Sequence, residues 1–116
     1  PGQAVITSAY NLPNRYIIHC LGPVFGKDKP EHLLLADCFI NSLQLAERKG
    51  IGSIAFPAIS TGAFGYPVEG AAAVALSTIV KQTASLKSLK IIRIVLYGEL
   101  EYETHVDKLN DMLKQQ

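Results

Sequence analysis

The residues best suited to chemistry lie together in one short stretch of the chain. Gly62 and Gly65 let the backbone bend sharply and let a bulky group approach it. Ser60 and Thr61 add two hydroxyl groups that can donate hydrogen bonds. A helix predicted to begin at Pro67 adds unpaired backbone N–H groups and a partial positive charge. A phosphate or diphosphate is the ligand that such a loop suits.

The residues alone leave a second interpretation open, in which the stretch is only a tight strand-to-helix turn. The loop has no lysine, so it is not the nucleotide-binding P-loop, which requires Gly-Lys-Ser/Thr. Two aromatic residues are equally ambiguous. Phe64 either folds onto the core or covers a ligand, and Tyr97 either stacks on a nucleobase or lies at the rim of the core.

No catalytic or metal-binding set emerges from the remaining candidates. His19 and Cys20 are neighbours on a predicted strand and so face opposite sides, and we interpret His19 as a core histidine. Cys20 and Cys38 lack CxxC spacing, which favours buried, reduced thiols in a cytoplasmic protein over a disulfide, zinc site or nucleophile. No Ser/His/Asp set can be assembled.

The elements that must position the loop alternate between strand and helix. Residues 31–49 show helical spacing of apolar side chains, and Gly50 follows where a left-handed residue ends a helix. The predicted strands are residues 4–7, 15–20, 53–56 and 91–97, and the predicted helices are residues 31–49, 68–83 and 101–116. This order predicts a three-layer α/β domain with a largely parallel sheet. Parallel strands would place Pro57 and Tyr97 at the same sheet edge, where ligands bind.

Composition excludes several classes of protein. The chain has 116 residues, 48% hydrophobic and 18% charged, which indicates one globular domain. It has no apolar run of membrane-spanning length and no export signal, so we expect no membrane partner and a cytoplasmic location. The net charge is +1 and no basic stripe is present, so we expect no specific nucleic-acid partner.

Three segments resemble macrodomains, particularly the MacroD-like hydrolase branch. Residues 53–67, SIAFPAISTGAFGYP, resemble the second ligand loop of that family. Residues 10–23, which end in His-x-x-Gly-Pro, resemble its strand pair, and residues 94–97 resemble its last strand. The similarity runs from about Gly2 to the C-terminus, so residues 1–116 are identified as a single, partial macrodomain with a three-layer α-β-α fold and a mixed, largely parallel sheet.

The resemblance implies a domain that binds ADP-ribose or an ADP-ribosylated protein. Pro57 and Ala58 are expected to border the adenosine, with Tyr97 against the adenine or its ribose. The diphosphate and distal ribose are expected to be held by Ser60, Thr61, Gly62, Ala63, Phe64 and Gly65. This branch hydrolyses protein ADP-ribosyl esters and O-acetyl-ADP-ribose, and no metal or cofactor is implied. The alternatives are a non-catalytic reader of ADP-ribosylated proteins and a structural module.

The chain also departs from the family pattern at its start. The family's first strands and helix, its first glycine-rich loop and its catalytic Asp and His have no counterpart here, so no catalytic residue is assigned and His19 does not replace them. One of the missing strands belongs between residues 15–20 and 53–56. We therefore expect a C-terminal part of a longer protein. The alternative is a shortened protein that replaces the strand in trans by forming an oligomer.

Overall fold

The computed structural model of the chain describes residues 1–9 and 15–114. The elements follow the predicted order. Residues 11–14 have the sequence Asn-Leu-Pro-Asn, which predicts a turn, and they lie outside the described residues. The strands are β1 (Ala4–Ser8), β2 (Tyr16–Cys20), β3 (Ser53–Pro57) and β4 (Ile91–Val95). The α-helices are α1 (Glu31–Arg48), α2 (Val68–Gln82) and α3 (Glu99–Lys114), with short 3-10 turns η1 (Gly62–Phe64) and η2 (Thr83–Ser85).

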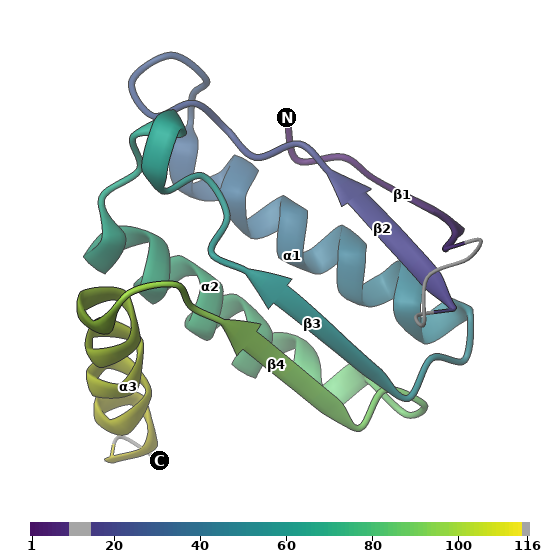
Figure 1. Cartoon of the computed structure of the whole chain (residues 1–116). Helices are drawn as coiled ribbons and strands as arrows, with labels where there is room; N and C mark the ends of the chain where they lie inside the picture. Colours follow the sequence, from purple (N-terminus) through teal and green to yellow (C-terminus); the bar gives the residue numbers. More distant parts are fainter. Residues whose placement is uncertain (10–14, 115–116) are drawn as a thin grey trace.

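The strands form two separate two-stranded sheets. β1 pairs with β2 in antiparallel register, with Ala4 opposite Cys20, and β3 pairs with β4 in parallel register, with Pro57 opposite Val95. Among the described residues, no ladder joins β2 to β3. β2, β3 and β4 nevertheless run in the same direction, with β2 beside β3 (Figure 1). The strand directions are therefore mixed and largely parallel, as predicted, and the break lies where a missing strand is expected.

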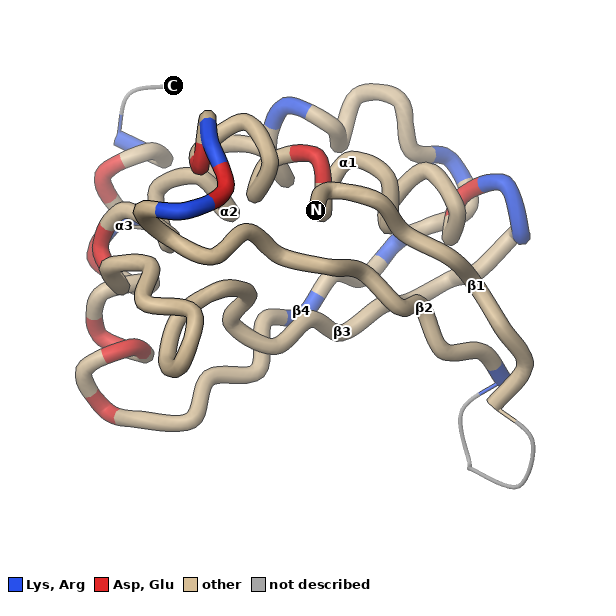
Figure 2. The backbone as a smooth tube through the Cα atoms, turned by 90° about the horizontal axis from the view of Figure 1, so that it is seen from above, with Lys and Arg blue, Asp and Glu red and all other residues tan. Residues whose placement is uncertain are grey.

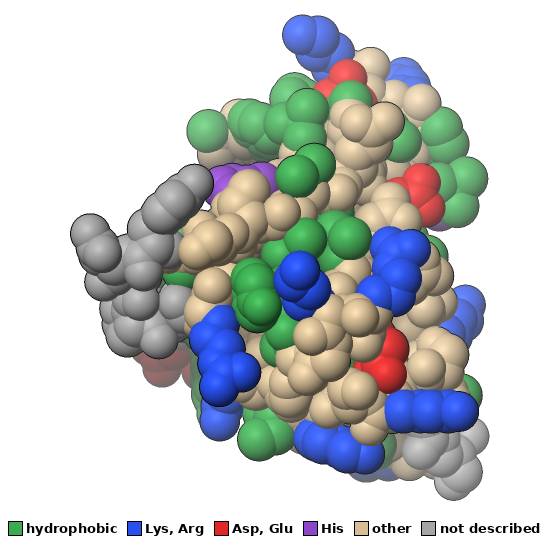
Figure 3. All heavy atoms as spheres, turned by 90° about the vertical axis from the view of Figure 1, so that its right-hand side faces the viewer, with side chains coloured by type: hydrophobic (Ala, Val, Ile, Leu, Met, Phe, Trp, Pro, Cys, Tyr) green, Lys and Arg blue, Asp and Glu red, His purple; other side chains and the backbone are tan. Residues whose placement is uncertain are grey.

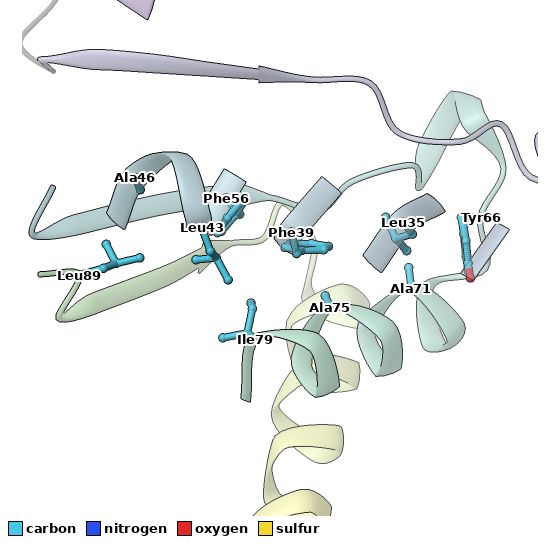
Figure 4. Packing of buried hydrophobic residues seen from close by; sticks show 10 residues of the cluster. All are labelled: Leu35, Phe39, Leu43, Ala46, Phe56, Tyr66, Ala71, Ala75, Ile79 and Leu89. Atoms are coloured by element: carbon cyan, nitrogen blue, oxygen red, sulfur yellow. The ribbon is translucent and has the colours of Figure 1, made fainter. Parts of the chain in front are cut away.

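The core lies between the strands and one layer of helices. α1 packs against α2, and α2 packs against α3. Phe39 of α1 meets Phe56 of β3 with ring centroids 5.0 Å apart. The buried cluster is shown in Figure 4 and comprises Leu35, Phe39, Leu43, Ala46, Phe56, Tyr66, Ala71, Ala75, Ile79 and Leu89. α1 supplies its largest fully buried side chains, and truncating one of them to Ala would cost about 2–5 kcal/mol.

The opposite face of the strands is open. The nearly all-apolar run at residues 91–97 predicts a strand covered on both faces, and this prediction is wrong. Ile92 and Ile94 pack toward the helices, whereas Ile91 and Val95 are 47% and 63% exposed. The side chains alternate because the described helices all lie on one side. The strand also ends at Val95, two residues earlier than predicted.

The boundaries of α1 follow from local chemistry. Pro30 precedes the helix as its N-cap residue rather than occupying its first position. Gly50 has the left-handed conformation expected after a helix, with φ +72°. Near this end, the Glu47 carboxylate accepts hydrogen bonds from the N–H groups of Ser88 (2.9 Å) and Leu89 (3.0 Å). These bonds tie the end of α1 to the segment that enters β4.

Candidate ligand loop

The loop between β3 and α2 is closed by its own backbone. The Gly65 N–H donates to the Gly62 carbonyl and the Tyr66 N–H to the Ser60 carbonyl, each at 2.9 Å. Gly62 and Gly65 have φ +70° and +78°, so the sequence located the flexible positions correctly. Ser60 is also left-handed, with φ +67°, which is uncommon for a residue with a side chain. No sequence signal marks that position.

Three backbone N–H groups of the loop are open to a ligand. Gly62 and Ala63 are the first two residues of the η1 turn, where N–H groups have no partner within the turn. In the described part of the chain, no hydrogen bond uses the N–H of Thr61, Gly62 or Ala63. Residues 50–80 contain no Lys or Arg. Any anion would therefore be held by backbone N–H groups rather than by a cationic side chain.

The segment after β2 packs against the loop. A Cβ atom on Gly22 would lie 2.3 Å from Ser60 Oγ and 2.7 Å from Ile59 Cγ2, so only glycine allows this close approach. The Phe25 N–H donates to the Phe64 carbonyl at 2.9 Å. The rings of Phe25 and Tyr66 lie 5.0 Å apart. The two motif segments noted in the sequence are thus one packed unit.

The residues expected at the adenosine end meet at one edge of the β3–β4 sheet. Pro57 lies opposite Val95, so Ala58 and Tyr97 follow the ends of paired strands. Tyr97 is fully exposed, so the interpretation that places it at the rim of the core is wrong. The side chain of Phe64, at the loop tip, is 37% exposed. It is therefore not buried in the core, but part of it packs against the protein. Figure 2 marks several Asp and Glu positions along α3, the helix that follows Tyr97.

His19 is not a core histidine, which corrects the interpretation from the sequence. It is exposed and its Nε2 lies 3.0 Å from Thr7 Oγ1. Cys20 faces the other way, as expected, and both cysteines are free. Cys38 is buried and donates to the Leu21 carbonyl at 3.3 Å, whereas Cys20 is only partly buried. The neighbouring Cys38 thiol lowers the pKa of Cys20.

The loop carries no group suited to proton transfer at neutral pH. Its one titratable side chain is Tyr66, whose pKa is raised by burial. Within residues 1–9 and 15–114, no three His, Cys, Asp or Glu side chains lie close enough together to hold a metal ion. No helix formed by these residues has the length and hydropathy to cross a membrane. The arrangement can bind and orient an anionic ligand through its backbone.

His105 is a buried titratable residue that the sequence did not single out. His105 of α3 is buried, and its Nδ1 lies 2.8 Å from the Glu101 carbonyl, so Nδ1 carries a proton. It lines an apolar cavity of about 310 Å³ between α2, β4 and α3. The sequence places His105 on an amphipathic helix, four residues after Glu101. That position does not distinguish His105 from the other residues of the helix, so its burial could not be predicted.

Comparison with known proteins places the chain in a family. The Macro domain family model matches residues 1–75. A macro domain-containing protein of Caldanaerobacter subterraneus is 46% identical over 90% of this chain and 59% of its own length. The O-acetyl-ADP-ribose deacetylase of Klebsiella pneumoniae is 47% identical over 85% of this chain and 57% of its own length. The chain thus spans less than two thirds of the length of these relatives.

Solved structures agree with the sequence comparison. The Oceanobacillus iheyensis macrodomain with ADP superposes with a TM-score of 0.93 at 38% identity, covering 99% of this chain and 60% of that one. The Trypanosoma brucei macrodomain in complex with ADP-ribose superposes with a TM-score of 0.82 at 34% identity, covering 91% of this chain and 44% of that one. The family match over more than half of the chain and the shared fold together show that this chain belongs to the macrodomain family.

Proposed function

We propose that this chain binds ADP-ribose or an ADP-ribosyl group through the loop between β3 and α2. The observation that carries the proposal is the set of open N–H groups on Thr61, Gly62 and Ala63 in a loop without a cationic side chain. Such a set suits a diphosphate. Two structural neighbours are macrodomains with ADP and with ADP-ribose, which supports the same ligand class here.

The roles of the individual residues follow the same proposal. Ser60, Thr61, Gly62, Ala63, Phe64 and Gly65 hold the diphosphate and distal ribose, and Phe64 covers the bound ligand. Pro57, Ala58 and Tyr97 border the adenosine. The shared sheet edge and the full exposure of Tyr97 support the second group, because an exposed ring is free to stack on a base.

Hydrolysis of O-acetyl-ADP-ribose or of protein ADP-ribosyl esters is a second candidate function. It is favoured by relatives named O-acetyl-ADP-ribose deacetylase and ADP-ribose glycohydrolase MACROD2, the latter from Xenopus laevis and 45% identical. The absence of an acid or base at neutral pH among loop residues 57–67 instead favours a reader that binds ADP-ribosylated proteins. A cytoplasmic location is part of the proposal and rests on the two free cysteines.

The binding proposal is tested by nuclear magnetic resonance titration of the chain, which detects even millimolar affinity. ADP-ribose is expected to shift the amide signals of residues 60–65, and adenosine alone is expected to do so far more weakly because it has no diphosphate. Equal responses to the two ligands, or shifts confined to other parts of the chain, would contradict the proposal.

A matched pair of glycine variants separates ligand contact from backbone strain. Gly62 and Gly50 both have left-handed φ, +70° and +72°, and a Cβ would meet nothing within 4 Å at either position. Gly62→Ala and Gly50→Ala are therefore expected to lose similar stability, about 1–2 kcal/mol. Only Gly62→Ala is expected to weaken ADP-ribose binding. Equal affinity of the two variants would exclude the loop as the diphosphate site.

A further inference from the structure

The two cysteines, which lie far apart in the sequence, meet where β2 packs against α1. Cys20 is the last residue of β2, and Cys38 lies inside α1. Their side chains are within hydrogen-bonding reach of each other. The Cys38 thiol also donates to the carbonyl of Leu21, the residue after Cys20, at 3.3 Å. The fold thus brings together two free thiols that the sequence spacing did not connect, and neighbouring thiols are the arrangement from which a disulfide forms.

The two thiols differ in their access to solvent. Cys38 is 0% exposed, whereas Cys20 is half-buried and lines a cavity of about 1080 Å³ between β2 and β3. Arg15 and Lys49 line the same cavity and are exposed, so the cavity opens to solvent, because such side chains keep their charged groups in water. Figure 3 shows Lys and Arg side chains around apolar ones on the face where β2, β3 and β4 begin. A small reagent can therefore reach Cys20 but not Cys38.

The surroundings of Cys20 favour its reactive form, which is the thiolate. A hydrogen bond from the Cys38 side chain lowers the pKa of Cys20 to about 7, although partial burial opposes this shift. The contact with Cys20, together with burial, raises the pKa of Cys38, which therefore keeps its proton. An accessible thiolate beside a second thiol is the arrangement found in cysteines that are oxidised reversibly.

We propose that Cys20 is a site of reversible oxidation by a hydroperoxide, with Cys38 as the thiol that converts the product into a disulfide. The Cys20 thiolate attacks the hydroxyl oxygen of the hydroperoxide. The O–O bond breaks, its electron pair leaves with hydroxide or alkoxide, and the sulfur is oxidised by two electrons to a sulfenic acid.

The second step joins the two sulfur atoms. Oxidation removes the negative charge of Cys20, which is one of the causes that raise the pKa of Cys38. The Cys38 sulfur then attacks the Cys20 sulfur, and the hydroxyl group of the sulfenic acid leaves as water with the proton of the Cys38 thiol. Two molecules of a small cellular thiol reduce the disulfide and restore both cysteines. The inference is independent of ADP-ribose binding.

The test treats the reduced chain with hydrogen peroxide at pH 7 and follows the product by mass spectrometry. The sequence contains only these two cysteines, so an intramolecular disulfide can join no other pair. We expect each chain to lose the mass of two hydrogen atoms, to stay unlinked to other chains, and to regain that mass with dithiothreitol. The same chain unfolded in urea is the control, and the disulfide should form about tenfold more slowly there, because unfolding separates the two thiols.

Two serine variants assign the roles of the thiols, since each replaces one thiol with a hydroxyl. Cys38→Ser should stop at the sulfenic acid of Cys20, which dimedone traps, and should then proceed to a sulfinic acid that dithiothreitol does not reduce. Cys20→Ser should consume peroxide about tenfold more slowly than the parent chain, because its remaining thiol is buried and protonated.

Three outcomes would overturn the proposal: disulfides that form only between chains, a folded chain that forms its disulfide no faster than the unfolded one, or oxidation of Cys20→Ser at the parent rate. The first two are measured on the parent chain, so they decide the question even where a variant does not fold. The third would assign the reactive thiol to Cys38.

Discussion

The contact between Gly22 and Ser60 joins two motifs that lie far apart in the sequence. Ser60 holds a left-handed backbone conformation, and its buried hydroxyl has no hydrogen-bond partner among the described residues. Both features are costly without support from the surroundings. Gly22 lies directly against that hydroxyl and leaves no room for another atom. The glycine therefore fixes the conformation of the ligand loop from outside the loop.

Gly22→Ala is expected to destabilise the protein by about 1–3 kcal/mol, because the added methyl group would overlap Ser60 and Ile59. Adding Ser60→Ala should recover part of this loss, since a Cβ on Gly22 lies an ordinary 3.5 Å from Ser60 Cβ. Gly52→Ala is the control, because nothing lies within 4 Å of its Cβ position. Chemical denaturation of the parent chain, Gly22→Ala, Ser60→Ala alone, the double variant and Gly52→Ala measures the coupling. Purely additive losses would mean that the two residues are not in contact.

At this scale, the sequence predicted what depends on one residue's own chemistry. Gly62, Gly65 and Gly50 are left-handed as expected, because only glycine adopts that conformation without strain. The close approach of Gly22 to Ser60 depends on where the fold brings the two segments, which local chemistry does not encode. His19 was misplaced for the same reason, since its burial depends on which face the helices cover.

The helices and strands are tied together by side-chain contacts at their ends. Glu47, in the last turn of α1, accepts hydrogen bonds from the segment that leads into β4. Those backbone hydrogen bonds lower the pKa of the Glu47 carboxyl in the folded state. Because the folded pKa lies below the unfolded one, the stabilisation is present above the unfolded pKa of about 4.3 and is lost as pH falls through the folded pKa.

Glu47→Gln is expected to lower the melting temperature at pH 7, and the difference from the parent chain should shrink as the pH falls from 5 toward 3. Thermal unfolding across that range measures the effect. Glu103→Gln removes an equal charge from an exposed position on α3 and should show no such convergence. A melting-temperature difference that stays constant with pH would mean that the carboxylate form of Glu47 contributes nothing.

The elements themselves were well predicted, because each has a local signal. Apolar spacing placed α1 and α2 within two residues of their observed ends. The burial of β4 on both faces was predicted wrongly, because burial depends on where the helices pack and not on the strand's own residues. A run of apolar residues is typical of a strand buried on both faces, but Ile91 and Val95 face a side without a described helix.

At the scale of the whole molecule, the β1–β2 pair is attached to the rest through α1. Figure 1 shows the β1–β2 pair next to α1, on the side of β3 that faces away from β4. Side chains of α1 hydrogen-bond to backbone groups that flank this pair. The Asn41 Nδ2 donates to the Gly2 carbonyl at 2.8 Å, and the Cys38 thiol donates to the Leu21 carbonyl. The β3–β4 pair instead contributes Phe56 to the central cluster. The two pairs should therefore open separately.

Asn41→Ala tests this separation. Loss of the bond to Gly2 should speed hydrogen exchange at the β1-facing amides of Ile17 and His19 by about tenfold, in line with a contribution near 1.4 kcal/mol. The β4-facing amides of Ile54 and Phe56 should keep their rates. Gln44→Ala, at an exposed position of the same helix, controls for the substitution itself. Equal acceleration in both strand pairs would show that the sheets unfold as one unit, even though no ladder between described residues joins them.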